Sequence, residues 1–255
     1  MEKITDYNLS ISKIKITYVI SSLANEGPVN VMYNIIKYLD TSVYKITIVT
    51  LIQEKENSRF KDFENLGLKI IQLHQKTHSK SFIKKISAFR KLIQEINPKI
   101  VHSHCPRSLI YISLLPKNIN TVYTAHNFPG ILTKALYGNF KGTIVIKLSN
   151  FLMNRVDLAI ACSESVSQEF LDVYGWKVQA INNGCSLDVW ESDPIEKKAI
   201  RSSLNLDSEI KYFLFIGRFS KEKNPNFLID QFESLTSTNS CLLMLGDGPL
   251  YAEIS

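Results

Sequence analysis

The sequence predicts an α/β protein with a doubly wound parallel sheet, followed by the beginning of a second domain of the same kind. Two observations support this fold class. From residue 14 onward, short runs rich in β-branched residues alternate with amphipathic stretches, which is the order of strands and crossover helices in a parallel sheet. The strand runs are also apolar almost throughout, which is typical of strands that helices cover on both faces.

The first predicted domain is Rossmann-like and occupies residues 14–190. Its expected strands are 15–22, 44–52, 68–73, 99–104, 120–126, 157–163 and 178–184. Its expected helices are 28–39, 81–96, 147–155 and 165–174. Ligands of such sheets bind at the carboxyl ends of the strands, so functional side chains are expected in the segments that follow them.

A second unit begins after the polar linker SLDVWESDPIEKK, and we place it at residues 195–255. It is predicted to contain a helix at 199–204, a strand at 211–219, a helix at 225–235 and a strand at 241–246. Two strands leave an open edge and do not close a parallel sheet. We therefore expect an incomplete second Rossmann-like domain in a truncated chain.

Composition and charge narrow the class of protein. No apolar run reaches the roughly 18 residues of a membrane-spanning helix, and the N-terminus lacks the apolar core of a signal peptide. We therefore expect a cytoplasmic protein. The net charge is +6, with basic residues concentrated between Lys76 and Lys91. That run favours peripheral contact with the anionic inner face of a membrane, and a solvated helix face is the alternative.

Other partners are not expected. The chain has no helix-turn-helix, RRM or zinc-finger pattern, so nucleic acid is not predicted as a partner. Its four cysteines lie far apart, with no CxxC pair and no histidine at metal-ligand spacing. The sequence therefore predicts no metal site.

The most specific motif is FIGRFSKEKNP, at the end of the strand predicted at 211–219. The strand ends in Gly217, and Arg218 and Lys223 follow before the next helix. A glycine lets a ligand approach the backbone, while arginine and lysine side chains bind diphosphates. The N-terminus of the next helix adds a partial positive charge. The alternative interpretation is a loop with two solvated charges.

This segment, together with LGDGPLYAEI, resembles the opening of the C-terminal domain of glycosyltransferase family 4, where a GR…KN pattern precedes a strand and a Gly-Asp-Gly-Pro turn. PKIVHSHCPRS, TVYTAHN, VDLAIACSES and VQAINNGCSLDVW resemble motifs of the N-terminal domain of that family, in the same order. The resemblance extends over nearly the whole chain. It implies the GT-B fold, in which the acceptor is held mainly by the first domain and the nucleotide sugar mainly by the second.

The resemblance also assigns roles to individual residues. The implied catalytic residues are His126, Arg218 and Lys223. The implied contacts to the donor diphosphate come from Gly27, Gly217, Arg218 and Lys223. Gly27 follows the first strand, where many relatives have two adjacent glycines and this chain has one. The candidates on the acceptor side are His102, His104, Arg107 and Asn127, the last at a position where relatives often have Asp.

The function implied is that of a retaining glycosyltransferase, which moves a sugar from a nucleotide-sugar donor to a lipid-linked or polysaccharide acceptor in cell-surface polysaccharide biosynthesis. The leaving diphosphate accepts the proton of the acceptor, so no metal or other cofactor is expected. The donor-site glutamates of the family would lie beyond Ser255, so we expect this chain to be inactive. One alternative is a non-catalytic acceptor- or membrane-binding subunit that pairs with a separate donor-binding polypeptide. The weaker alternative, a nucleotide-sugar epimerase, is disfavoured by GRFSKEKN.

Overall fold

The computed structural model describes residues 12–77, 79–130, 133–134, 138–185, 193–235 and 239–254. The chain divides into two compact units, Met1–Ser186 and Leu187–Ser255, which we call the first and the second unit.

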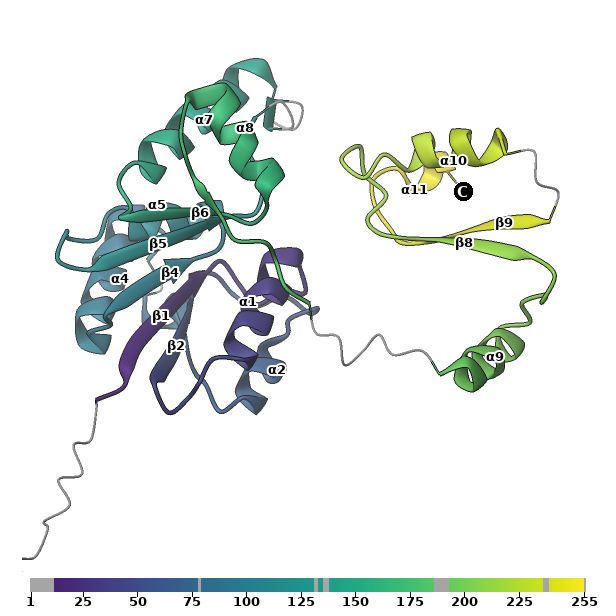
Figure 1. The fold of residues 1–255 in the computed structure, drawn as a ribbon. Coiled ribbons are helices and arrows are strands. Elements are labelled where there is room, and N and C mark those ends of the chain that lie inside the picture. The colour runs from purple at the N-terminus through teal and green to yellow at the C-terminus, as the bar shows by residue number, and fades with distance from the viewer. Residues whose placement is uncertain are drawn as a thin grey trace, which may run out of the picture. The chain divides into compact units, whose positions relative to one another are not determined.

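The first unit contains a parallel sheet of seven strands, as predicted, and the structure gives their order as β3-β2-β1-β4-β5-β6-β7 (Figure 1). The strands are β1 Ile14–Ile20, β2 Tyr44–Thr50, β3 Lys69–Gln72, β4 Ile100–Ser103, β5 Asn120–Ala125, β6 Leu158–Ala161 and β7 Gln179–Ala180. The chain first runs outward from β1 to β3 and then returns to β4 on the other side of β1. The strand order therefore reverses between β1 and β4, which is where doubly wound sheets bind ligands.

Helices connect the strands of this sheet. Those described in full are α1 Gly27–Lys37, α2 Phe60–Asn65, α3 Leu73–Lys76, α4 Phe82–Ile96, α5 Pro106–Ile112, α7 Asn139–Met153 and α8 Glu164–Tyr174. Helix α8 shows how the sequence sets their ends. It begins where the Ser163 hydroxyl accepts a hydrogen bond from the Val166 N–H, and it ends at Gly175 in the left-handed conformation, with φ 67°.

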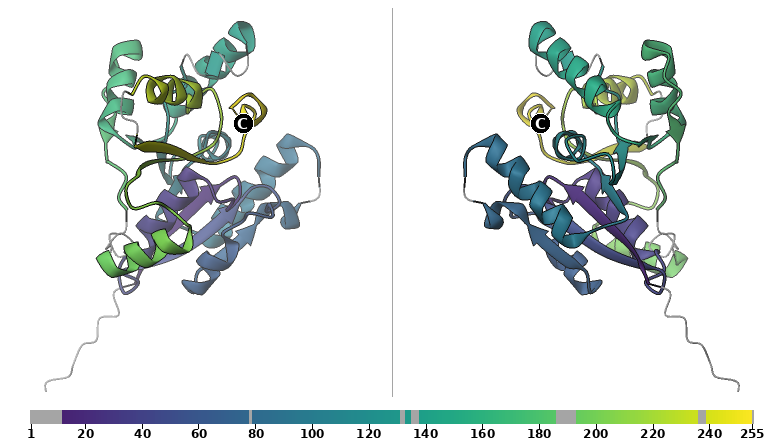
Figure 2. Two further views of the ribbon diagram at one scale, coloured as in Figure 1. Left: turned by 90° about the vertical axis from the view of Figure 1, so that its right-hand side faces the viewer. Right: turned by 90° about the vertical axis from the view of Figure 1, so that its left-hand side faces the viewer.

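Two hydrophobic clusters form the core of the first unit, one on each face of the sheet. Alternate residues of a strand point to opposite faces. Tyr18 of β1 thus joins the cluster under α1 and α2, while its neighbour Val19 joins the cluster under α4, α5 and α8. Figure 2 shows α1 and α4 on opposite sides of the sheet. Fully buried Phe63 and Phe89 are among the largest side chains of the two clusters.

The second unit contains a parallel pair of strands, β8 Lys211–Ile216 and β9 Ser240–Leu245. Its helices are α9 Pro194–Ser203, α10 Pro225–Glu233 and α11 Tyr251–Ile254. Both strands expose apolar side chains, including Ile216 at 72% and Leu245 at 57%. Phe219, which follows β8, is buried.

Several elements differ from the predicted bounds. The helix predicted at 147–155 begins at Asn139, because Gly142 is tolerated inside it and packs closely against Lys134. The strand predicted at 178–184 comprises only Gln179–Ala180. Helix α5 was not predicted: its start is fixed by Cys105 and Ser108, a capping pair that lacks the usual Ser or Thr at the first position. Within the described ranges, no helix is long and apolar enough to cross a membrane.

Candidate functional site

The carboxyl ends of β1, β4 and β5 meet where the strand order reverses, and the segments after them carry the candidate side chains of the first unit. The Ser21 hydroxyl lies 3.1 Å from the thiol sulfur of Cys105, which joins the segment after β1 to the segment after β4. The same thiol lies 3.2 Å from the Ser108 hydroxyl in the first turn of α5. These contacts fix the two segments at the reversal point.

Three histidines stack in a row at this edge, and we call His102, His104 and His126 the histidine row. Strand register places His102 beside Tyr18 of β1, and the two ring centroids are 5.3 Å apart. His104 follows two residues later on the same face, with its ring centroid 4.3 Å from that of His102 and 5.3 Å from that of His126. Two adjacent strands thus bring together three residues predicted for the site.

Hydrogen bonds hold the row in place. The Nε2 atom of His102 lies 2.8 Å from the hydroxyl of Thr124 on β5. The Nδ1 atom of His104 lies 3.1 Å from Nε2 of His126. The Cys162 thiol, after β6, donates to the backbone carbonyl of His126 at 3.4 Å. The histidine row is therefore held by contacts with β5 and with the segment that follows β6.

Burial makes the histidine row electrically neutral. It lowers the pKa of His126 to about 4 and, helped by repulsion from His126, that of His102 to about 4. His104 is 1% exposed, and burial together with its two histidine neighbours lowers its pKa well below the usual range. At pH 7 the row therefore offers hydrogen bonds and carries no positive charge.

The buried nitrogen of His104 determines which atoms carry protons. Its Nε2 is buried and has no hydrogen-bond partner within the described residues. A buried N–H without an acceptor is less favourable than a buried lone pair without a donor, so the proton of His104 is assigned to Nδ1. That Nδ1–H then donates to Nε2 of His126, which leaves the proton of His126 on its own Nδ1. His126 thus keeps one N–H donor for a ligand.

The other candidates of the first unit lie nearby without joining the row. Gly27 is the first residue of α1, and a Cβ atom there would meet nothing within 4 Å, so its backbone is open to a ligand. Arg107 and Asn127 are exposed and follow β4 and β5. Among the described residues, no hydrogen bond connects either of them to the histidine row.

The candidates of the second unit surround the end of β8. The Gly217 N–H donates to the Leu245 carbonyl at 3.0 Å. Arg218 and Lys223 are exposed on the following turn, and neither makes an ion pair in the described part of the chain. The turn closes where the Lys223 N–H donates to the Ser220 carbonyl at 3.0 Å, before α10 begins at Pro225. Both cations thus follow one strand end.

Helix α7 has an exposed apolar face that was not predicted from the sequence. Phe140, Ile144, Leu148 and Phe151 follow one another at the spacing of a helix face and are 80%, 51%, 47% and 58% exposed. Residues 126–156 contain no Asp or Glu, while Lys141 and Lys147 lie in the helix itself. The spacing was visible in the sequence, but Gly138 and Gly142 obscured the helix.

Comparison with known proteins identifies relatives. Residues 26–189 match Glycosyltransferase Family 4. The D-inositol 3-phosphate glycosyltransferase of Streptosporangium roseum is 33% identical over 76 residues, which are 29% of this chain and 17% of that protein.

Solved structures share the fold. HepE from Anabaena, solved in complex with UDP, has a TM-score of 0.71 and 16% identity, covering 94% of this chain and 62% of that chain. Sucrose-phosphate synthase from Thermosynechococcus elongatus has a TM-score of 0.63 and 14% identity, covering 90% of this chain and 62% of that chain. This chain therefore spans about three fifths of the length of these structures.

Proposed function

The chain belongs to glycosyltransferase family 4, and we propose that it takes part in transferring a sugar, with retention of configuration, from a nucleotide-sugar donor to a lipid-linked or polysaccharide acceptor. The observation that supports this most directly is the neutral histidine row at the reversal of the first sheet. Neutral imidazoles form directional hydrogen bonds with sugar hydroxyls without attracting unrelated anions. Family membership favours transfer over the epimerase alternative.

In the proposed reaction, each unit has its own task. His126 donates its remaining N–H to a sugar hydroxyl, and Arg218 and Lys223 bind the donor diphosphate. The bond between the anomeric carbon and a diphosphate oxygen breaks, a bond to the acceptor oxygen forms, and the acceptor proton passes to the diphosphate. The two cations stabilise the charge that develops on the leaving group. The proposed reaction uses no metal.

Titration with UDP tests the donor site, because HepE was solved with UDP. We expect Arg218→Ala and Lys223→Ala each to weaken UDP binding by about ten-fold or more, since each removes a charge-assisted hydrogen bond worth about 1.5–3 kcal/mol. Lys221→Ala, an exposed lysine of the same turn, is the matched control and should change the Kd less than about two-fold. An equal loss in all three variants would show general charge attraction and contradict the assignment.

Turnover separates the catalytic proposal from its alternative. We expect release of UDP from a UDP-sugar in the presence of a glycan acceptor, and a loss of about ten-fold or more in kcat/KM for His126→Leu. Retention of activity in His126→Gln, which keeps an N–H donor, would support hydrogen bonding as its role. Turnover that requires a second polypeptide would favour the non-catalytic subunit.

We also propose that the first unit binds the inner face of a membrane peripherally. The lysine-rich segment Lys76–Lys91 includes the start of α4, where Phe82 and Ile83 are 49% and 79% exposed. The apolar face of α7 adds a second surface of the same chemistry, because the charged residues beside it in the sequence are all basic. We expect the chain to sediment with phosphatidylglycerol vesicles, and we expect Phe140→Ser to weaken this sedimentation. Ile195→Ser, at an equally exposed position of α9, should leave it unchanged.

A further inference from the structure

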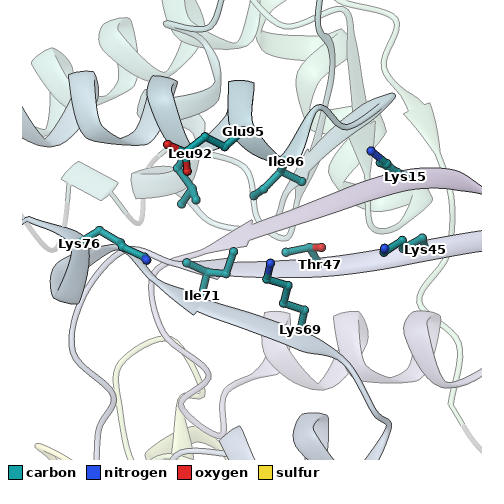
Figure 3. Close-up of a pocket in the computed structure, with 9 residues that line it drawn as sticks. All are labelled: Lys15, Lys45, Thr47, Lys69, Ile71, Lys76, Leu92, Glu95 and Ile96. Carbon is teal, nitrogen blue, oxygen red and sulfur yellow. The ribbon is translucent and has the colours of Figure 1, made fainter.

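A trough of about 370 Å³ lies in the first unit, away from the histidine row. It runs between the last turns of α4 and the face of β1, β2 and β3 that α4 covers (Figure 3). Leu92, Glu95 and Ile96 of α4 form one side. Its volume falls within the roughly 300–1,000 Å³ of small-molecule sites.

Four lysines line the trough: Lys15 of β1, Lys45 of β2, Lys69 of β3 and Lys76 of α3. Figure 3 shows their side chains around the space between the sheet and α4. Glu95 is the one acidic residue in the lining, so four ammonium groups against one carboxylate leave three positive charges. None of the four lysine side chains makes an ion pair or hydrogen bond within the described ranges.

The arrangement of these lysines is unfavourable without an anion. Lys15 and Lys45 are direct register partners on adjacent parallel strands, on the same face of the sheet. Neighbouring strands are about 4.8 Å apart, and like charges at facing positions destabilise a sheet. Lys69 extends the cluster, because its register partner on β2 is Thr47, two residues after Lys45.

A hydroxyl joins the lysines in the lining. Thr47 is 6% exposed as a residue, and it lines the floor of the trough beside its register partner Lys69 (Figure 3). Its side chain makes no hydrogen bond in the described part of the chain, so its hydroxyl is available to a ligand in the trough. Together with the ammonium groups, it provides the donors that phosphate oxygens accept.

Structural explanations account for only part of this cluster. A lysine on an edge strand prevents sheet-to-sheet aggregation, which explains Lys69 on β3. Lys15 and Lys45 lie on interior strands, where that role does not arise. The carboxyl end of α4 contributes roughly half a negative charge, which reduces the excess but leaves more than two positive charges.

We propose that this trough binds a small phosphorylated ligand with at least two negative charges, such as a phosphate monoester or a pyrophosphate group. The lysines hold the phosphate oxygens, Thr47 donates a hydrogen bond from the floor, and Leu92 and Ile96 contact any apolar part. The site differs from the proposed donor site, since all of its residues belong to the first unit.

Pyrophosphate titration of the full chain at constant ionic strength tests the proposal. The chain carrying Arg218→Ala and Lys223→Ala serves as the background, because it lacks the proposed diphosphate contacts of the second unit. In this background we expect one pyrophosphate to bind per chain, and Lys45→Met with Lys69→Met to weaken binding by about ten-fold or more. Lys84→Met, an exposed lysine of α4 outside the trough, should leave the Kd unchanged.

Two results would overturn the proposal. One is pyrophosphate binding that disappears in the background variant alone, which would place all binding in the second unit. The other is binding that the Lys45 and Lys69 substitutions leave unchanged. Neither result bears on sugar transfer, which the UDP titration tests separately.

Two further measurements refine the site. The first is co-sedimentation with phosphatidic acid vesicles. If Lys45→Met and Lys69→Met abolish it, the phosphate belongs to a lipid headgroup. If these variants lose pyrophosphate binding but sediment unchanged, the phosphate belongs to a soluble molecule. In buffer without multivalent anions, we expect Lys45→Met to raise the urea midpoint, because it relieves repulsion from Lys15. A lowered midpoint would show that Lys45 stabilises the fold and contradict the proposal.

Discussion

The neutral histidine row makes the first unit sensitive to acid. An unfolded chain binds protons on histidine with a pKa of about 6.5, whereas His102 and His126 bind them in the folded chain only near pH 4. Between these values the unfolded state holds more protons than the folded state, so the free energy of unfolding falls as the pH is lowered. The stabilisation is complete above pH 6.5 and is lost progressively down to about pH 4.

The loss is large enough to measure at mild pH. Each pH unit below 6.5 lowers the free energy of unfolding by about 1.4 kcal/mol for every histidine that stays neutral when folded. At pH 5.5 the three histidines together therefore remove about 3 to 4 kcal/mol, with partly exposed His126 contributing least. A domain has roughly 5–15 kcal/mol of stability in total, so this loss is a substantial fraction.

Urea unfolding at pH 7.5 and pH 5.5, followed by Trp176 fluorescence, measures this effect. Trp176 packs against Tyr174 in the first unit, with ring centroids 5.4 Å apart, and Trp190→Phe removes the second indole signal. We expect His102→Phe to recover about 1 kcal/mol of the acid loss, because a phenylalanine has no proton to gain.

An equal free energy of unfolding at the two pH values would contradict a neutral histidine row, since neutral imidazoles in the folded chain require a difference. A full acid loss in His102→Phe, as large as that of the parent chain, would contradict it as well. In that case, the proton uptake would belong to other groups.

Two substitutions test how other residues stabilise the units. A Cβ at Gly246 would lie 1.9 Å from the Gly217 carbonyl oxygen, so Gly246→Ala should lower the free energy of unfolding by about 3 kcal/mol and speed hydrogen exchange at the Gly217 N–H. The control is Gly184→Ala, which should be tolerated because a Cβ there would have no atom within 4 Å. Burial raises the pKa of Asp157, but hydrogen bonds from the Thr121 N–H and hydroxyl, both 2.8 Å, lower it overall. Because Asp157 is exposed and solvent screens its carboxylate, Asp157→Ala should cost at most about 1 kcal/mol at pH 7 in urea unfolding, and less as the carboxylate becomes protonated in acid.

The strands could be predicted because their signal is local. Each apolar run, such as Tyr44–Thr50, carries its own composition, and the chain order of strands and helices defines a parallel sheet. The same reasoning placed His102, His104 and His126 at strand ends, where the structure has them. Helix α7 was predicted eight residues too short at its start, because glycine weakens a helical pattern and its tolerance depends on packing against Lys134.

Contacts within the site could not be predicted, because they depend on register. The hydrogen bond between His104 and His126 requires the pairing of β4 with β5, and the stacking of Tyr18 on His102 requires that of β1 with β4. No spacing along the chain encodes either pairing. The neutrality of the row is likewise a consequence of burial, since histidine is close to half-protonated near pH 6.5 in water.

The close packing of the histidine row requires its members to be neutral. Two protonated imidazoles about 5 Å apart repel by about 3 kcal/mol at an effective dielectric constant of about 20, so the row keeps its geometry only while its members are uncharged. An uncharged row cannot balance a diphosphate. In the proposed reaction the charge of the diphosphate is therefore balanced by other groups, and we assign this role to Arg218 and Lys223. On this proposal, the histidine row orients the sugar, and the two cations lower the barrier to departure of the diphosphate.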